Sequence, residues 1–317
     1  MHQEQTEPFF TALHLDRPDQ QALDALLDTL AAQHNHSVLA VIVYGSCLRS
    51  GDIFDGLVDL YLLCSSYRDA FGAGGFAVGN KLLPPNVLYA QQESGARVLR
   101  SKVNVMSLAD FQRACTPRHF ESYFWGRFAQ PVALPRVRDD AARQAIATAL
   151  RDASRTLLKR SLPVLPPSGS ISDLWVDALQ LSYATELRTE RPGRTRQLVV
   201  ASETFYLAAA VHAASDPTLH LAVDFSVSPP AYRSKVSPRR RVLSRLAWTL
   251  RRVTGKLLSI ARLVKALFTF NSGLDYIAWK LERHSGEPIT IPPRVRRWPL
   301  LYSWGFFWRL YRRGIFR

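Results

Sequence analysis

The sequence predicts an α+β fold, and three observations support this prediction. Residues 37–44 are a short β-branched and apolar run that ends at Gly45. Residues 57–63 are a second apolar run, interrupted only by Asp59. Both runs have the length and composition of buried strands. Helical spacing of apolar side chains over residues 20–34 precedes them, so helices and strands are expected to share one folded unit.

Further elements follow in order. Residues 66–80 begin with a helical pattern and become Gly-rich, residues 97–106 alternate as a third strand does, and 108–115 opens a helix. Residues 139–161 and 172–187 are helical patterns on either side of a Pro/Ser/Gly linker at 163–170.

We therefore divide the chain into an α/β unit at 1–138, a helical domain at 139–230 and a C-terminal region at 231–317. A winged-helix-like arrangement is one option for the helical domain.

Charge is segregated along the 317 residues. Residues 231–317 hold 20 Lys and Arg against three acidic residues, a balance of +17, whereas residues 1–230 hold 21 against 23. Hydrophobic residues make up 47% of the chain and charged residues 21%, which excludes wholesale disorder. The front of the chain is thus an ordinary near-neutral globular protein, and the C-terminal region is a basic arm that we expect to meet a different partner.

Several classes of protein are disfavoured. The three cysteines, Cys47, Cys64 and Cys115, form no CxxC pair and no metal-ligand spacing, which indicates reduced thiols. The acidic start of the sequence is unlike a signal or transit peptide, and no run approaches 18 consecutive apolar residues. We expect a protein on the cytoplasmic face of a membrane, attached to it without spanning it.

The basic arm carries the membrane prediction. Residues 239–268 form an amphipathic helical pattern, with an apolar stripe from Leu243 to Phe268 and arginines and lysine gathered on the other side. Such a helix suits an anionic lipid surface. Residues 298–317 interleave Trp and Tyr with Arg, as the headgroup layer favours. Nucleic-acid binding is the competing interpretation, but the continuous apolar stripe favours the membrane, and we expect no nucleic-acid partner.

The candidate chemistry centres on the turn between the first two strands. Gly45 permits close backbone approach to a phosphate, and the Ser46 hydroxyl with the following amides can contact phosphate oxygens. Asp59 interrupts an apolar strand, where a carboxylate is costly unless it binds a cation such as Mg²⁺. This strand–Gly-Ser–turn–strand pattern is that of a polymerase-β-type nucleotidyltransferase domain. Alone it is weak, because a turn serine and an edge-strand aspartate explain most such pairs.

Four ordered segments give the pattern more weight. YGSCLRSGDIFDGLVDLYLL at 44–63 resembles the YGSG…[IV]-D-F segment of mitochondrial-type phosphatidate cytidylyltransferases, the translocator assembly and maintenance family. RSKVNVMSLADF at 100–111 is similar to that family's L-x-K-Y-G-V segment, YFWGRFAQPV at 123–132 to its L-Y-V-A-G-R-L-x-K-P-V, and LSYATELRTERPGR at 181–194 to its L-S-Y-x-G-D-F-R. The resemblance covers roughly residues 40–195.

The chain also departs from these patterns. Leu57 stands where polymerase-β-type nucleotidyltransferases usually have a first strand carboxylate, and the family that the chain resembles likewise has an apolar residue there. Cys47 replaces the glycine after Gly-Ser, and Val103-Asn104 replaces Tyr-Gly after the lysine. Glu186 replaces an aspartate.

The resemblance implies that CTP and phosphatidic acid react to give CDP-diacylglycerol and pyrophosphate at an anionic membrane surface. It implies Mg²⁺ on Asp59 and Glu186, with Lys102 as a further catalytic residue. Gly45, Ser46, Arg127 and Arg188 would bind the nucleotide. From the polar cluster in residues 270–286, we name Lys280, Arg283 and His284 as substrate candidates.

Several of these residues could instead have an ordinary structural role. Lys102 suits a solvated strand surface, Arg127 a helix cap, and Glu186 with Arg188 an exposed helix end. Asp55 suits a turn, or a second metal ligand. Two other functions stay open: nucleotidyl transfer with another nucleotide or lipid phosphate, and an inactive scaffold that binds membrane or nucleic acid.

Overall fold

The computed structural model describes residues 9–187, 193–269, 282 and 287–312, and it has a mixed α/β architecture. Its main sheet has five strands in the order β3-β4-β2-β1-β5. These strands are β1 (Val38–Tyr44), β2 (Val58–Cys64), β3 (Asn86–Ser94), β4 (Arg97–Ser107) and β5 (Ala133–Val137). The β2–β4 pair is parallel and the other pairs are antiparallel, so the sheet is mixed.

Both faces of the central strands are buried. On one face, side chains such as Val43, Leu60 and Val103 pack against α1 (Arg17–Gln33). On the other, residues such as Ile42 and Met106 pack against a layer of helices. Because alternate residues of a strand point to opposite faces, continuous apolar runs are what two covered faces require.

The helical layer has its own small sheet. Its helices are α5 (Leu108–Cys115), α6 (Tyr123–Phe128), α7 (Asp140–Ser161), α8 (Ile171–Tyr183), α9 (Arg194–Ala201) and α10 (Glu203–Ala214). The small sheet runs β6-β8-β7, from β6 (Ser168–Ser170), β7 (Leu221–Asp224) and β8 (Ala231–Ser234), with the short helix η2 (Pro217–Leu219) before β7. One continuous core of buried side chains joins these helices to the main sheet.

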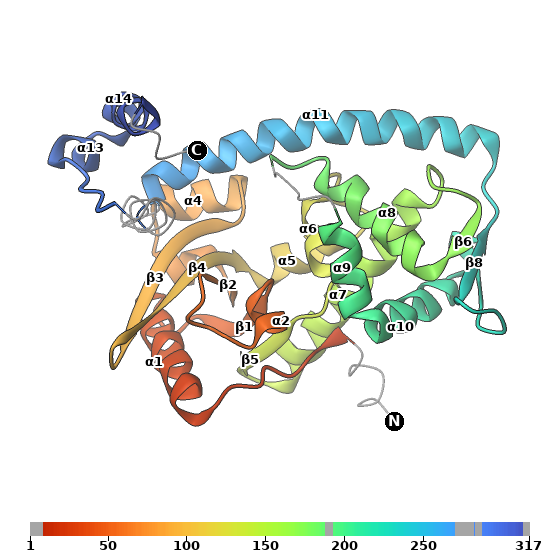
Figure 1. Ribbon diagram of the computed structural model, residues 1–317, viewed down its shortest axis with the longest axis horizontal. Coiled ribbons are helices and arrows are strands. Elements are labelled where there is room, and N and C mark those ends of the chain that lie inside the picture. The colour runs from red at the N-terminus through yellow and green to blue at the C-terminus, as the bar shows by residue number, and fades with distance from the viewer. Residues whose placement is uncertain (1–8, 188–192, 270–281, 283–286, 313–317) are drawn as a thin grey trace.

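A single long helix spans both parts. Helix α11 (Pro238–Thr269) leaves β8, crosses over the helical layer and ends beside α4 (Gly75–Leu82) and β3 (Figure 1). Helices α13 (Pro293–Arg297) and α14 (Pro299–Arg312) follow at the same end.

Most sequence-based element predictions are confirmed. The predicted strands at 37–44, 57–63 and 97–106 are β1, β2 and β4, and the predicted helices at 20–34, 139–161 and 239–268 are α1, α7 and α11. The 66–80 segment forms two short helices, α3 (Tyr67–Phe71) and α4. The edge strands β3 and β5 and the small sheet were not predicted, because their polar, partly exposed residues carry little apolar periodicity.

The close contact between α6 and α8 leads to a prediction about stability. A Cβ added at Gly126 of α6 would lie 2.2 Å from Ser182 Oγ and 2.7 Å from Ser182 Cβ on α8. Gly126→Ala should therefore lower the free energy of unfolding by about 1–3 kcal/mol through overpacking. Gly79→Ala, which meets nothing within 4 Å inside helix α4, should instead raise stability by about 0.5–1 kcal/mol. Chemical denaturation of both variants checks this, and equal effects at the two sites would contradict it.

Candidate functional site

A cavity of about 520 Å³ lies where the end of β1 meets the helical layer. It is lined from the sheet side by Tyr44, Gly45, Ser46, Arg49, Asp59 and Lys102, and from the helical side by Arg127, Gln130, Tyr183, Glu186, Leu187, Arg194, Thr195, Gln197, Leu198 and Ala201. Four basic side chains face two carboxylates among these residues. The described cavity is thus cationic on balance and suited to a polyanion.

Strand register sets the sheet side of the cavity. Tyr44 pairs with Asp59 across the β1–β2 ladder, and Asp59 pairs with Lys102 across the β2–β4 ladder. The three residues share the sheet face that carries Tyr61 and Met106, which is the face under the helical layer. An aspartate and a lysine 43 positions apart in the chain therefore become neighbours at one edge of the cavity.

Gly45 makes the turn out of β1. Its φ is +92°, in the region that favours glycine. A Cβ at this position would also lie 3.1 Å from Asp59 Oδ2. Both the backbone conformation and the closeness of the Asp59 carboxylate thus require glycine here. The turn keeps the exposed Ser46 at the cavity wall, and the Arg49 guanidinium donates to the Gly45 carbonyl at 3.1 Å.

The Tyr44 hydroxyl joins the two sides of the cavity. It accepts from Arg127 Nη1 at 2.9 Å and from Asn104 Nδ2 at 3.3 Å, and it donates to Asp59 Oδ1 at 3.5 Å. These contacts use the donor and both acceptor positions of a phenol. Burial, and then the charge of Asp59, raise the pKa of Tyr44, so the hydroxyl keeps the proton that it donates.

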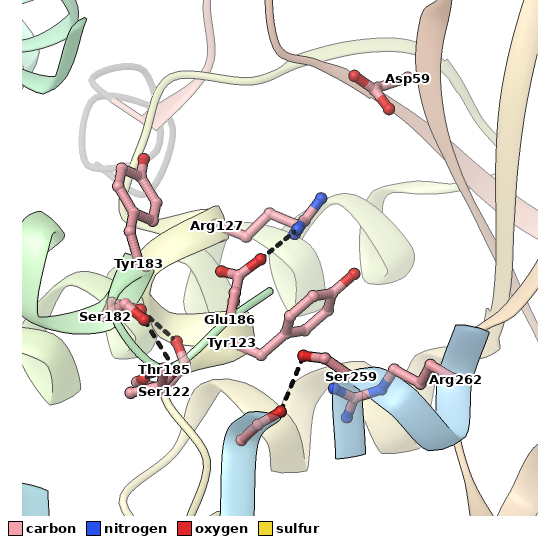
Figure 2. A network of polar contacts seen from close by, with 12 residues as sticks. Asp59, Ser122, Tyr123, Arg127, Ser182, Tyr183, Thr185, Glu186, Ser259 and Arg262 are labelled. Carbon is pink, nitrogen blue, oxygen red and sulfur yellow. Dashed lines mark hydrogen bonds and ion pairs between the residues drawn. The ribbon is translucent and has the colours of Figure 1, made fainter. Parts of the chain in front are cut away.

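Arg127 and Glu186 form the helical side. Arg127 Nη2 lies 3.2 Å from Glu186 Oε2, and only 14% and 10% of the two side chains are exposed. Glu186 Oε1 and Arg127 Nε are buried without a hydrogen-bond partner. Figure 2 shows this pair together and the Asp59 carboxylate lying apart from it. Glu186 Oε1 is therefore a buried acceptor beside the cavity whose hydrogen-bonding capacity is unused.

The carboxylates of the cavity decide whether it can hold a metal ion. Among the described residues, no group of three or more His, Cys, Asp and Glu side chains is arranged to hold a metal ion. Mg²⁺, however, is usually bound by one or two carboxylates together with substrate phosphates and water. Asp59, which forms no ion pair with Arg127, fits a site of that kind, whereas Glu186 is engaged by Arg127.

Six residues predicted from sequence line this one cavity: Gly45, Ser46, Asp59, Lys102, Arg127 and Glu186. Arg188, Lys280, Arg283 and His284 lie outside the described residues. Asp55 is not among the lining residues; the Asp52 carboxylate accepts from its backbone N–H at 3.1 Å, as in a turn.

Sequence reasoning missed several lining residues, including Tyr44, Arg49, Gln130 and Arg194. Tyr44 ends the strand directly before Gly-Ser, and its hydroxyl on an otherwise apolar run was the available signal. Arg194 enters the cavity from the first turn of α9, a helix that the sequence pattern did not predict.

No known protein family profile matches the chain, and no curated protein matches it at a significant level.

The cysteine beside the cavity gives a pH prediction. Burial, and then the nearby Asp59, raise the pKa of Cys47 from 9.0 to about 11. The native state therefore holds this proton more tightly than the unfolded state, and the resulting stability is present below pH 9 and lost as the pH rises toward 11. Wild type should lose up to about 2–3 kcal/mol more than Cys47→Ala over that window. Urea denaturation at pH 8, 9, 10 and 11 measures the difference, and parallel curves for the two proteins would contradict it.

Proposed function

We propose that this protein is a Mg²⁺-dependent nucleotidyltransferase of the phosphatidate cytidylyltransferase type. It would transfer the cytidylyl group of CTP to phosphatidic acid at a membrane surface, giving CDP-diacylglycerol and pyrophosphate.

The main support for this proposal is that all four segments of the resemblance contribute residues to one cavity. Residues 44–63 contribute Gly45 and Asp59, 100–111 contribute Lys102, 123–132 contribute Arg127, and 181–194 contribute Glu186. The segments span 150 residues of chain, and nothing in their spacing alone requires them to come together. Their meeting supports the view that they act as one site.

The topology agrees with the same proposal. The antiparallel β1–β2 pair joined by the Gly-Ser turn, with β4 parallel to β2, is the arrangement expected of a polymerase-β-type domain. The order α7, β6, α8, α10, with the short helix α9 between the last two, then the β7–β8 hairpin with β6 pairing to β8, resembles that of a winged-helix-like unit. Both similarities, in the strand arrangement and in the order of helices and strands, support the proposal.

The proposed reaction does not require a strong general base. An oxygen of the lipid phosphate, already ionised near neutral pH, attacks the α-phosphorus of CTP, and the bond to the β-phosphate bridging oxygen breaks as pyrophosphate leaves. Catalysis then depends on position and on neutralising charge. Arg127, oriented by Glu186 and Tyr44, offers its positive charge and the second N–H of each Nη atom to phosphate oxygens, and Lys102 offers a point charge beside Asp59.

Mg²⁺ held by Asp59 and the phosphate oxygens would supply charge stabilisation for the leaving pyrophosphate. The backbone after Gly45 and the Ser46 hydroxyl stand where they can contact the same phosphates.

Helix α11 supports the membrane part of the proposal. Leu243, Leu246, Leu250, Val253 and Leu257 are 54–64% exposed. The buried residues of the same helix, Trp248 and Arg251, face the body of the protein. The apolar stripe therefore points away from the protein, flanked by exposed basic residues such as Arg245 and Arg252, which suits burial in an anionic lipid interface.

The C-terminal helix α14 adds to this surface. Trp298, Leu301 and Trp304 at this end of the molecule are 56–82% exposed, and Arg309 and Arg312 lie in the last turn of the helix. Exposed aromatic residues with arginines favour the headgroup layer. Among the described residues, no helix is long and apolar enough to cross a bilayer.

The catalytic proposal predicts the effect of removing one carboxylate. Asp59→Asn should lower CDP-diacylglycerol formation at least about 100-fold, because the charge that balances Mg²⁺ is lost while the side-chain volume is kept. The assay uses CTP, Mg²⁺ and phosphatidic acid in mixed micelles. Glu93→Gln, an exposed carboxylate on the same sheet, is the matched control and should keep wild-type activity.

The same variants separate the alternatives. An inactive scaffold would bind no CTP by calorimetry, and Asp59→Asn would change nothing. A transferase with another substrate would bind a nucleotide in an Asp59-dependent way but prefer a different triphosphate or lipid phosphate in a panel. Full activity of Asp59→Asn would overturn the site assignment altogether.

The membrane proposal predicts the effect of charging the apolar stripe. Leu250→Glu with Leu257→Glu should weaken binding to vesicles containing anionic phospholipid about tenfold or more for each substitution, because buried leucine is worth about 1.5–3 kcal/mol. Val211→Glu on α10, also exposed, should leave vesicle binding unchanged. Sedimentation with vesicles measures both, and undiminished binding of the double variant would place the membrane contact elsewhere.

A further inference from the structure

Helix α11 has a second face, and this face packs next to the cavity. The buried side chains on it, Trp248 and Arg251, bond to the body of the protein: Trp248 Nε1 donates to the Arg160 carbonyl at 2.9 Å, and Arg251 Nε donates to the Phe120 carbonyl at 2.8 Å. The same helix therefore presents leucines outward and reaches the segment that leads into α6, which carries Arg127.

One contact lies directly behind Glu186. A Cβ added at Gly255 of α11 would lie 2.6 Å from the Thr185 carbonyl oxygen and 3.0 Å from Thr185 Cβ. The helix backbone thus rests on the residue adjacent to Glu186. Thr185 Oγ1 also lies 3.0 Å from Ser122 Oγ, and Ser182 Oγ donates to the Ser122 carbonyl at 2.9 Å (Figure 2). These bonds tie the end of α8 to the start of α6.

The second contact lies behind Arg127. The Arg262 guanidinium of α11 stands 4.6 Å from the centre of the Tyr123 ring, and the Arg127 guanidinium stands 4.3 Å from the same centre. Figure 2 shows the ring lying between the two arginines. Arg262 is fixed by Glu121, with Nη2 2.6 Å from Oε2, and by the Pro84 carbonyl at 3.1 Å. Only 11% of the Arg262 side chain is exposed, so this arginine is not part of the lipid-facing surface.

We propose that α11 couples membrane attachment to the cavity, with Gly255, Arg262 and Tyr123 as positioning residues for the Arg127–Glu186 pair. This inference rests on the proposed function and deepens it: the enzyme would bind its nucleotide more tightly when α11 lies on lipid. Lipid that holds the outer face of α11 restrains the inner face against Thr185 and Tyr123, so less ordering remains to be done when the nucleotide binds.

Such coupling is reciprocal. If vesicles raise the affinity for CTP by some factor, then CTP with Mg²⁺ must raise the affinity for vesicles by the same factor. We expect a factor of about ten in wild type, within the range that such couplings show. The factor is a property that general destabilisation of the fold does not by itself remove, and it is therefore the readout.

Two variants interrupt the two contacts independently. Glu121→Gln with Arg262→Gln removes the arginine from Tyr123 without leaving a buried charge unpaired. Gly255→Ala forces α11 away from Thr185. Both should bind vesicles of anionic phospholipid as wild type does, and in both the coupling factor should fall below about twofold. Arg252→Gln, an exposed arginine on the same helix, is the matched control: it should weaken vesicle binding and keep the factor.

The measurements are CTP affinity by calorimetry with and without vesicles, and hydrogen exchange of residues 123–128 and 185–187 without nucleotide. Vesicles should slow exchange in both segments of wild type and in neither segment of the two variants. Unchanged exchange in wild type, or a full coupling factor in both variants, would overturn the inference. Absence of CTP binding under every condition would instead overturn the proposed function, and the exchange result would still decide the coupling.

Discussion

The structure around the cavity depends on one buried guanidinium. Arg127 is charged and only 14% exposed, and an unpaired charge at such a position would be costly. Its charge is balanced by groups from different parts of the chain: Tyr44 from β1, Glu186 after α8, and the Tyr123 ring from its own helix. The need to surround this charge holds the sheet, the helical layer and, through Tyr123 and Arg262, helix α11 in one arrangement.

This constraint separates the roles of the two carboxylates. Glu186 neutralises Arg127 and is held by it, whereas Asp59 contacts the neutral Tyr44 hydroxyl. Since the raised pKa of Tyr44 keeps that hydroxyl protonated, the Asp59 charge has no cationic partner through this contact. Glu186 is thus paired with an arginine, whereas Asp59 can bind a cation that arrives with the substrate. For this reason a chain with Leu57 in place of a first carboxylate can still be proposed as a transferase.

Helix α11 has two unlike faces for a physical reason. Its outward side chains are leucines and valines, and the inward ones include Arg251 and Arg262, which bond to backbone carbonyls and to Glu121. A surface helix of a soluble globular protein would be expected to do the reverse and bury its apolar stripe in the core. The inversion is consistent with a helix whose apolar partner is outside the protein.

The sequence by itself determined the buried strands β1, β2 and β4, the long helices α1, α7 and α11, and the presence of an apolar stripe along α11. These features follow from local periodicity, which the chain carries residue by residue.

Tertiary structure alone decided the rest. The register that sets Lys102 beside Asp59, the ion pair of Arg127 with Glu186, and the place of Arg194 and Tyr44 in the cavity depend on contacts between distant segments, and no local pattern encodes them. The same holds for Arg262: in the sequence it lies at the edge of a basic face, and only the packing of α11 shows that it is buried against Glu121 and Tyr123. The local sequence around a helical arginine is the same whether its side chain faces water or a buried carboxylate, because the partner comes from a distant segment of the chain.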